Sequence, residues 1–118
     1  MYMIFFVLHD ANWLKEVLDV WQNAGVGGIT ILPSTGLKRL QNSLAFRDDL
    51  PLMPSLEDLL QDEETLNRTL ITIVPSKEMV EKVVAATEEL IGDLNEPNTG
   101  ILAVIQLASV YGLDRKEK

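Results

Sequence analysis

A strand–helix–strand pattern occurs twice in this chain, and this repetition restricts the fold more than any other feature of the sequence. Residues 3–8 form an apolar run that is too short for a helix and rich in Phe, Ile and Val, which predicts a strand at the centre of a sheet or one buried on both faces. Residues 13–24 carry apolar side chains every three or four positions, which predicts an amphipathic helix that Gly25 can end. A second strand is expected over residues 28–32, with Pro33 ending it.

The second half of the chain repeats this order. Residues 69–74 are rich in Thr, Ile and Val and predict a strand. Ser76 is a suitable N-cap for a helix over residues 77–90, and Gly92 is a suitable stop for it. A polar loop then leads to a fourth apolar run over residues 101–107, which we interpret as the last strand.

Two such units in series predict an α+β, ferredoxin-like βαββαβ sandwich, with two helices on one face of an antiparallel four-stranded sheet. A doubly wound sheet would need more strands than 118 residues supply. A chain of this length builds one core, so we expect a single domain over residues 1–118.

A long insertion separates the two halves, at residues 37–68. Connections inside compact domains usually run to about four to six residues, so this segment is more than a simple loop. Its many leucines, together with Phe46 and Met53, make it too apolar for a disordered linker. Two hypotheses stay open: a folded piece that packs on the domain or on a neighbouring subunit, and a mobile loop that contacts a partner.

The overall charge argues against a nucleic-acid partner. The net charge is −8, with 18 acidic and 10 basic side chains, whereas duplex binding needs clustered Lys and Arg. No apolar run approaches the roughly 18 residues that suggest a membrane-spanning helix, so no membrane insertion is expected. The chain has no cysteine, and its apolar start lacks the basic flank of a signal peptide, so we expect a cytoplasmic protein.

The sequence contains no set of residues typical of an enzyme active site. His9 is the one histidine, and no nucleophile or second base is placed to work with it. A metal site would require His9, Asp10, Asp48 and Asp49 to converge, which the sequence indicates only weakly, so no metal is expected. We therefore predict a non-enzymatic protein.

Six segments together resemble the nitrogen regulatory PII signal transduction proteins. The first strand over residues 3–8, residues 14–18 and the glycine-containing segment 24–31 resemble the opening of that family, from its first strand through its first helix to its second strand. Residues 69–75, followed by 79–84, are similar to its third strand and second helix, and residues 92–101 stand where the family has its nucleotide-gripping B-loop.

This resemblance implies a homotrimer that acts in signal transduction and nitrogen regulation. Its subunits would bind a small ligand, in the family an adenine nucleotide and often 2-oxoglutarate, in clefts between neighbouring copies. The insertion 37–68 falls at the family's T-loop, which docks on target proteins. By position, the expected ligand-binding residues are Thr30, Gly36, Leu37, Lys38, Asn98, Thr99, Gly100 and Ile101.

The sequence also departs from the family pattern at charged positions. Residues 97–101 replace the B-loop Gly-Asp-Gly-Lys-Ile and lack its lysine, and the two arginines after the fourth strand are absent near Tyr111 and Leu113. The insertion contains no tyrosine to modify. Because a triphosphate is costly to hold without cations, an adenylate with fewer phosphates, another metabolite or no nucleotide all remain open. Two alternatives on the same scaffold also remain: a ligand-free structural or interaction module, and a metal-binding trimer like CutA.

Overall fold

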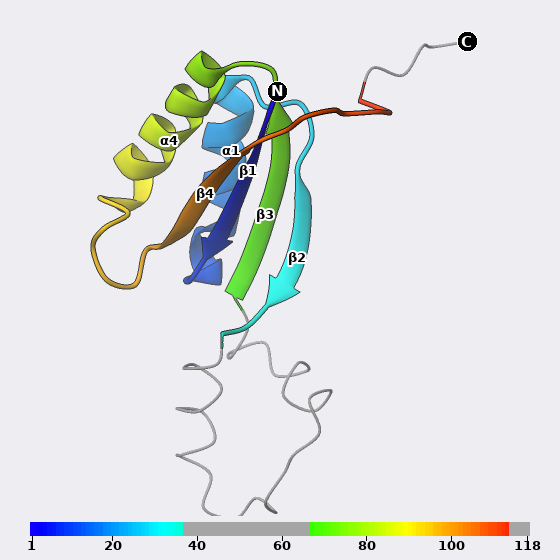
Figure 1. The fold of residues 1–118 in the computed structure, drawn as a ribbon. Coiled ribbons are helices and arrows are strands. Elements are labelled where there is room, and N and C mark those ends of the chain that lie inside the picture. Colours follow the sequence, from blue (N-terminus) through cyan, green and yellow to red (C-terminus); the bar gives the residue numbers. More distant parts are fainter. Residues whose placement is uncertain (37–66, 114–118) are drawn as a thin grey trace, which may run out of the picture.

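The computed structural model describes residues 1–36 and 67–113 of the chain. The described part contains four strands, two α-helices and one turn of 3-10 helix (Figure 1). In chain order the elements are β1 (Tyr2–Leu8), η1 (Ala11–Trp13), α1 (Leu14–Ala24), β2 (Thr30–Ser34), β3 (Asn67–Val74), α4 (Lys77–Ile91) and β4 (Gly100–Gln106). This order confirms the twofold strand–helix–strand pattern.

The four strands form one sheet in the order β2-β3-β1-β4, and every neighbouring pair is antiparallel. This is the strand order of a ferredoxin-like βαββαβ sandwich, so the predicted fold class is confirmed. Both helices lie behind the sheet in Figure 1, and no described helix covers its front. The sheet therefore has a helix-covered face and an open face.

The core lies between the sheet and the two helices. β1 is central in the sheet, and its alternate side chains Ile4, Phe6 and Leu8 are fully buried under the helices. The ring of Trp21 on α1 packs at a tilt of 35° against Phe6, with 6.0 Å between the ring centroids. The first strand was expected either at the centre of a sheet or buried on both faces. It is central in the sheet, and one of its faces is fully buried.

Trp21 and Thr87 connect α1 to α4 inside this core. The indole Nε1–H of Trp21 donates to Thr87 Oγ1 at 2.9 Å, and the Thr87 hydroxyl donates to the carbonyl oxygen of Val83 at 2.7 Å. Both residues are 0% exposed, so water cannot replace either bond if one partner is removed. The pair therefore satisfies a buried donor that would otherwise be costly.

We expect Thr87→Val to lower the free energy of unfolding by about 1–3 kcal/mol, because the buried indole N–H loses its acceptor. Urea unfolding followed by circular dichroism measures this loss. Adding Trp21→Phe to Thr87→Val removes the donor as well, so the double variant should lose less than the sum of the two single variants. Strict additivity would show that the hydrogen bond contributes nothing.

The helix ends follow the predicted signals, with one correction. Asp10 Oδ1 accepts from the backbone N–H of Asn12 at 3.0 Å, and Gly25 ends α1 with a φ of +112°. Ser76 Oγ likewise accepts from a backbone N–H in the first turn of α4, at 3.2 Å. The sequence pattern predicted that Trp13 belongs to the apolar face of the first helix. This prediction is wrong, because Trp13 lies in the 3-10 turn and is 39% exposed.

The second strand both begins and ends two residues later than the sequence pattern predicted, at Thr30–Ser34 and not at residues 28–32. Pro33 lies inside β2 and pairs with Arg68 of β3. A proline is tolerated there because β2 is an edge strand, where a missing N–H need not cost a ladder bond. The residues Asn67 and Arg68, assigned to the insertion, belong to β3. The rest of the insertion, residues 37–66, lies outside the described residues.

Candidate functional site

The expected ligand-binding residues divide between the two opposite edges of the sheet. Thr30 opens β2 and Gly36 follows its end, whereas Gly100 and Ile101 open β4. Asn98 and Thr99 directly precede β4, and Leu37 and Lys38 lie outside the described residues. Two strands, β3 and β1, separate the edges, which at about 4.8 Å per strand gives roughly 14 Å. One chain does not bring the two groups together.

The end of β2 and the start of β4 nevertheless lie at the same end of the sheet. Pro33 of β2 pairs with Arg68, Arg68 pairs with Leu8, and Leu8 pairs with Gly100. This cross-strand row places Gly36 and the turn before β4 near the same end (Figure 1). The chain between β2 and β3 also leaves from this end of the sheet.

The loop before β4 is held by its own hydrogen bonds. Asp93 accepts from the N–H groups of Asn95 and Glu96, each at 2.9 Å. The Thr99 hydroxyl lies 3.0 Å from the carbonyl oxygen of Glu96 and 3.3 Å from that of Leu94. Because its hydrogen serves the loop, Thr99 can offer a ligand only lone pairs.

Asn98 and Gly100, at the end of this loop, both have a positive φ, a backbone conformation that residues with a side chain rarely adopt. Asn98 has a φ of +65°, which asparagine tolerates better than most residues. Gly100 has a φ of +148°, and a Cβ built there would lie 2.7 Å from Cε1 of Phe6 and still closer to the Val7 carbonyl oxygen. Gly100 is therefore required by the close approach of β4 to β1, whatever its role in binding.

Arg68 is a candidate that the sequence pattern missed. It is the only charged side chain in the four strands, and it lies in the cross-strand row that joins the two groups of site residues. Its Nη1 donates to the carbonyl oxygen of Asn67 at 3.2 Å, and the residue remains partly exposed. The sequence pattern assigned Arg68 to the insertion and not to a strand. Its place in the sheet depends on its pairing with Pro33, which no local sequence pattern shows.

The metal hypothesis gains no support from the described part of the chain. Asp48 and Asp49 lie outside the described residues. Among residues 1–36 and 67–113, no three or more His, Asp or Glu side chains come together as a metal site. In the same ranges, no helix is both long and apolar enough to cross a bilayer.

The open face of the sheet is apolar over β1, β4 and most of β3. Phe5 pairs with Ile71 on one side and with Ala103 on the other, and paired side chains share a face of the sheet. The same register places these apolar side chains on the open face: Met3, Phe5, Val7, Leu32, Ile71, Ile73, Ile101, Ala103 and Ile105. It also places four polar side chains there, all on β2 and β3: Thr30, Ser34, Asn67 and Thr69. Ile101 is 63% exposed and Ile105 47% exposed. Antiparallel sheets with one solvated face usually alternate apolar with polar residues, so this face is typical of an interaction surface.

The strand order and the two helices define a ferredoxin-like α+β domain with a long connection between β2 and β3. No family model and no curated protein matches the chain. Among solved structures it is similar to a PII-like signalling protein from Thermus thermophilus, with a TM-score of 0.54, 21% identity and coverage of 88% of this chain and 83% of that one. It is also similar to the apo form of CPII, a nitrogen regulatory PII-like protein from Thiomonas intermedia, with a TM-score of 0.54, 19% identity and coverage of 88% and 85%. The chain has the fold of the PII-like signalling proteins.

Proposed function

We propose that this protein is a divergent member of the PII-like family and acts as a cytoplasmic, non-enzymatic regulator. Three copies assemble around their sheets, bind a small ligand in the clefts between them, and report the ligand to a partner protein through residues 37–68. Both solved structures named above are described as PII-like, and CPII as nitrogen regulatory.

The observation that carries the proposal is the division of the site between opposite edges of one sheet. The group around Gly36 lies at the β2 edge, and the group from Asn98 to Ile101 lies at the β4 edge. Two copies placed edge to edge bring the β2 group of one beside the β4 group of the other. The connection to β3 starts at Gly36, so a ligand in that cleft would touch the base of the segment proposed to signal.

The open apolar face supports assembly around the sheets. Its exposed isoleucines and Leu32 would be removed from water if the faces of several copies met. Burial of apolar surface contributes about 25 cal/mol per Å², so a face of this composition favours self-association.

The geometry favours an elongated ligand with little negative charge. Thr30 and Ser34 are the ends of β2, roughly 13 Å apart at about 3.3 Å per residue, so one ligand contacts both ends of the strand only if it is long. The net charge of −8 opposes a triphosphate. Arg68 shares the face of Leu8, opposite to that of Thr30, so it can pair with a single phosphate or carboxylate only where the ligand passes around the end of the sheet. We therefore propose an adenine nucleotide with few phosphates as the ligand.

Thermal unfolding with adenosine, AMP, ADP, ATP and 2-oxoglutarate tests this proposal. A ligand at about a hundred times its Kd stabilises the folded state by about 2.7 kcal/mol, which raises the midpoint by several degrees. We expect AMP to give a larger rise than ATP. If none of the five compounds raises the midpoint, the proposed nucleotide or 2-oxoglutarate sensing is wrong.

Thr30→Val should weaken the binding of the stabilising adenylate about threefold to tenfold, because one neutral hydrogen bond contributes about 0.5–1.5 kcal/mol. The adjacent variant Ile31→Val is a matched control, because the register places its side chain on the opposite face of β2. Isothermal titration calorimetry measures both affinities. Equal affinities for the two variants would remove Thr30 from the site.

A further inference from the structure

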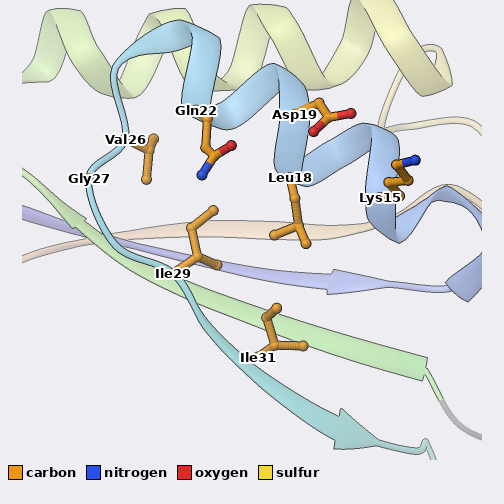
Figure 2. Close-up of a pocket in the computed structure, with 8 residues that line it drawn as sticks. All are labelled: Lys15, Leu18, Asp19, Gln22, Val26, Gly27, Ile29 and Ile31. Carbon is orange, nitrogen blue, oxygen red and sulfur yellow. The ribbon is translucent and has the colours of Figure 1, made fainter.

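A groove runs between α1 and the start of β2, on the face of the sheet opposite to the side chain of Thr30. Its volume is about 330 Å³, at the lower end of the roughly 300–1,000 Å³ found for ligand pockets. Leu18 projects from α1 towards the chain below, and Ile29 and Ile31 project back towards the helix (Figure 2). The groove is therefore floored by apolar side chains and suits a single large side chain.

The rim of this groove is polar and has no partner among the described residues. Lys15, Asp19 and Gln22 lie along it on α1, and all three are accessible to water. None of these side chains makes a hydrogen bond or an ion pair with a described residue. A carboxylate above an apolar floor is complementary to a group with a flat apolar body and a hydroxyl at its tip. A tyrosine side chain has this form.

The segment after β4, residues 107–113, offers such a side chain; we term it the C-terminal arm. The N–H of Leu107 donates to the carbonyl oxygen of Met1 at 2.9 Å, and residues 108–113 make no hydrogen bond with the described domain. The arm projects past β2 in Figure 1. Tyr111 is 92% exposed and Leu113 is 46% exposed. The ring of Tyr111 is therefore in water, where its large apolar area contributes no free energy of burial.

We propose that the C-terminal arm of one copy docks on the groove of another. The ring of Tyr111 rests on Leu18, Ile29 and Ile31 of the second copy, and its hydroxyl donates to the carboxylate of Asp19. Tyr111 does not fill the groove of its own chain, because its side chain is almost fully exposed. The arm and the groove are thus two unpartnered surfaces of one chain with complementary chemistry.

This contact joins two different surfaces, so it is heterologous, and a closed ring satisfies every arm and every groove. The inference rests on the proposed self-assembly but not on the ligand. It gives each subunit a contact outside the open face of the sheet, and it would make assembly depend on Tyr111.

Cysteine crosslinking tests this arrangement, because the chain has no cysteine of its own. The double variant Gln22→Cys/Ser109→Cys places one thiol on the rim of the groove and one on the arm, and leaves Tyr111 intact. Treatment with a short bis-maleimide and denaturing electrophoresis should give covalent species larger than a dimer. Adding Tyr111→Ala to the double variant should reduce these species at least fivefold.

The matched control is Glu89→Cys/Ser109→Cys, which moves the first thiol to an exposed position on α4. If this control crosslinks as well as the groove variant, or if the groove variant links only within one chain, the inference is wrong. Sedimentation of the uncrosslinked proteins separates the two proposals. An assembled protein that fails to crosslink overturns the arm contact alone, whereas a monomer overturns the proposed assembly as well.

Discussion

Gly100→Ala is expected to lower the free energy of unfolding by about 3 kcal/mol or more. A residue with a Cβ at a φ of +148° carries strain of roughly 1–3 kcal/mol. The added methyl group would also collide with the carbonyl oxygen of Val7 and lie 2.7 Å from Cε1 of Phe6, whose side chain is fully buried. The backbone atom cannot move aside without breaking the β1–β4 pairing, which begins at Leu8 and Gly100.

Thermal unfolding by circular dichroism measures the effect, with a midpoint lowered by on the order of 10 °C. The comparison is made at one protein concentration, since assembly makes the midpoint depend on concentration. Gly27→Ala is the control, because nothing lies within 4 Å of its added Cβ and its φ is not in the positive range. A Gly100→Ala protein as stable as Gly27→Ala would show that β4 does not approach β1 as closely as described.

Gly100 shows where sequence reasoning about the site reached its limit. The sequence indicates a glycine in a turn before a strand, which fits both a structural and a ligand-binding role. The contact with Val7 and Phe6 accounts for the glycine by packing alone. That contact joins residues more than ninety positions apart, so no local pattern contains it.

The elements of the fold were predictable because each carries its own local signal. The apolar period of α1 and α4, the cap at Ser76 and the stop at Gly25 all depend on neighbours a few residues away. Pro33 and Arg68 were assigned wrongly because their pairing depends on the strand order, which makes β2 an edge. A proline argues against a strand until its place at the edge of the sheet is known.

The division of the site has the same origin. Thr30 and Gly100 were grouped through the family resemblance, and nothing in their local sequence assigns them to opposite edges of a sheet. The strand order β2-β3-β1-β4 separates them within one chain. The proposed site therefore requires the proposed assembly, which can be tested on the sheet itself.

Ile105→Glu is expected to dissociate the proposed assembly into monomers at micromolar concentration. Ile105 lies on the open face of β4 and is 47% exposed, so the monomer tolerates a glutamate there. In a buried contact between sheets the same carboxylate would be desolvated without a partner, at a cost of about 3 kcal/mol or more. Each contact would then weaken roughly a hundredfold.

Val104→Glu is the matched control, because Val104 is the adjacent residue, is 42% exposed and lies on the helix-covered face of the same strand. Sedimentation equilibrium measures the mass of both variants, and circular dichroism shows whether each is folded. If Ile105→Glu assembles like the unmodified protein, the open face is not the interface. The apolar residues of that face then require a different partner, and the clefts between copies lose their main support.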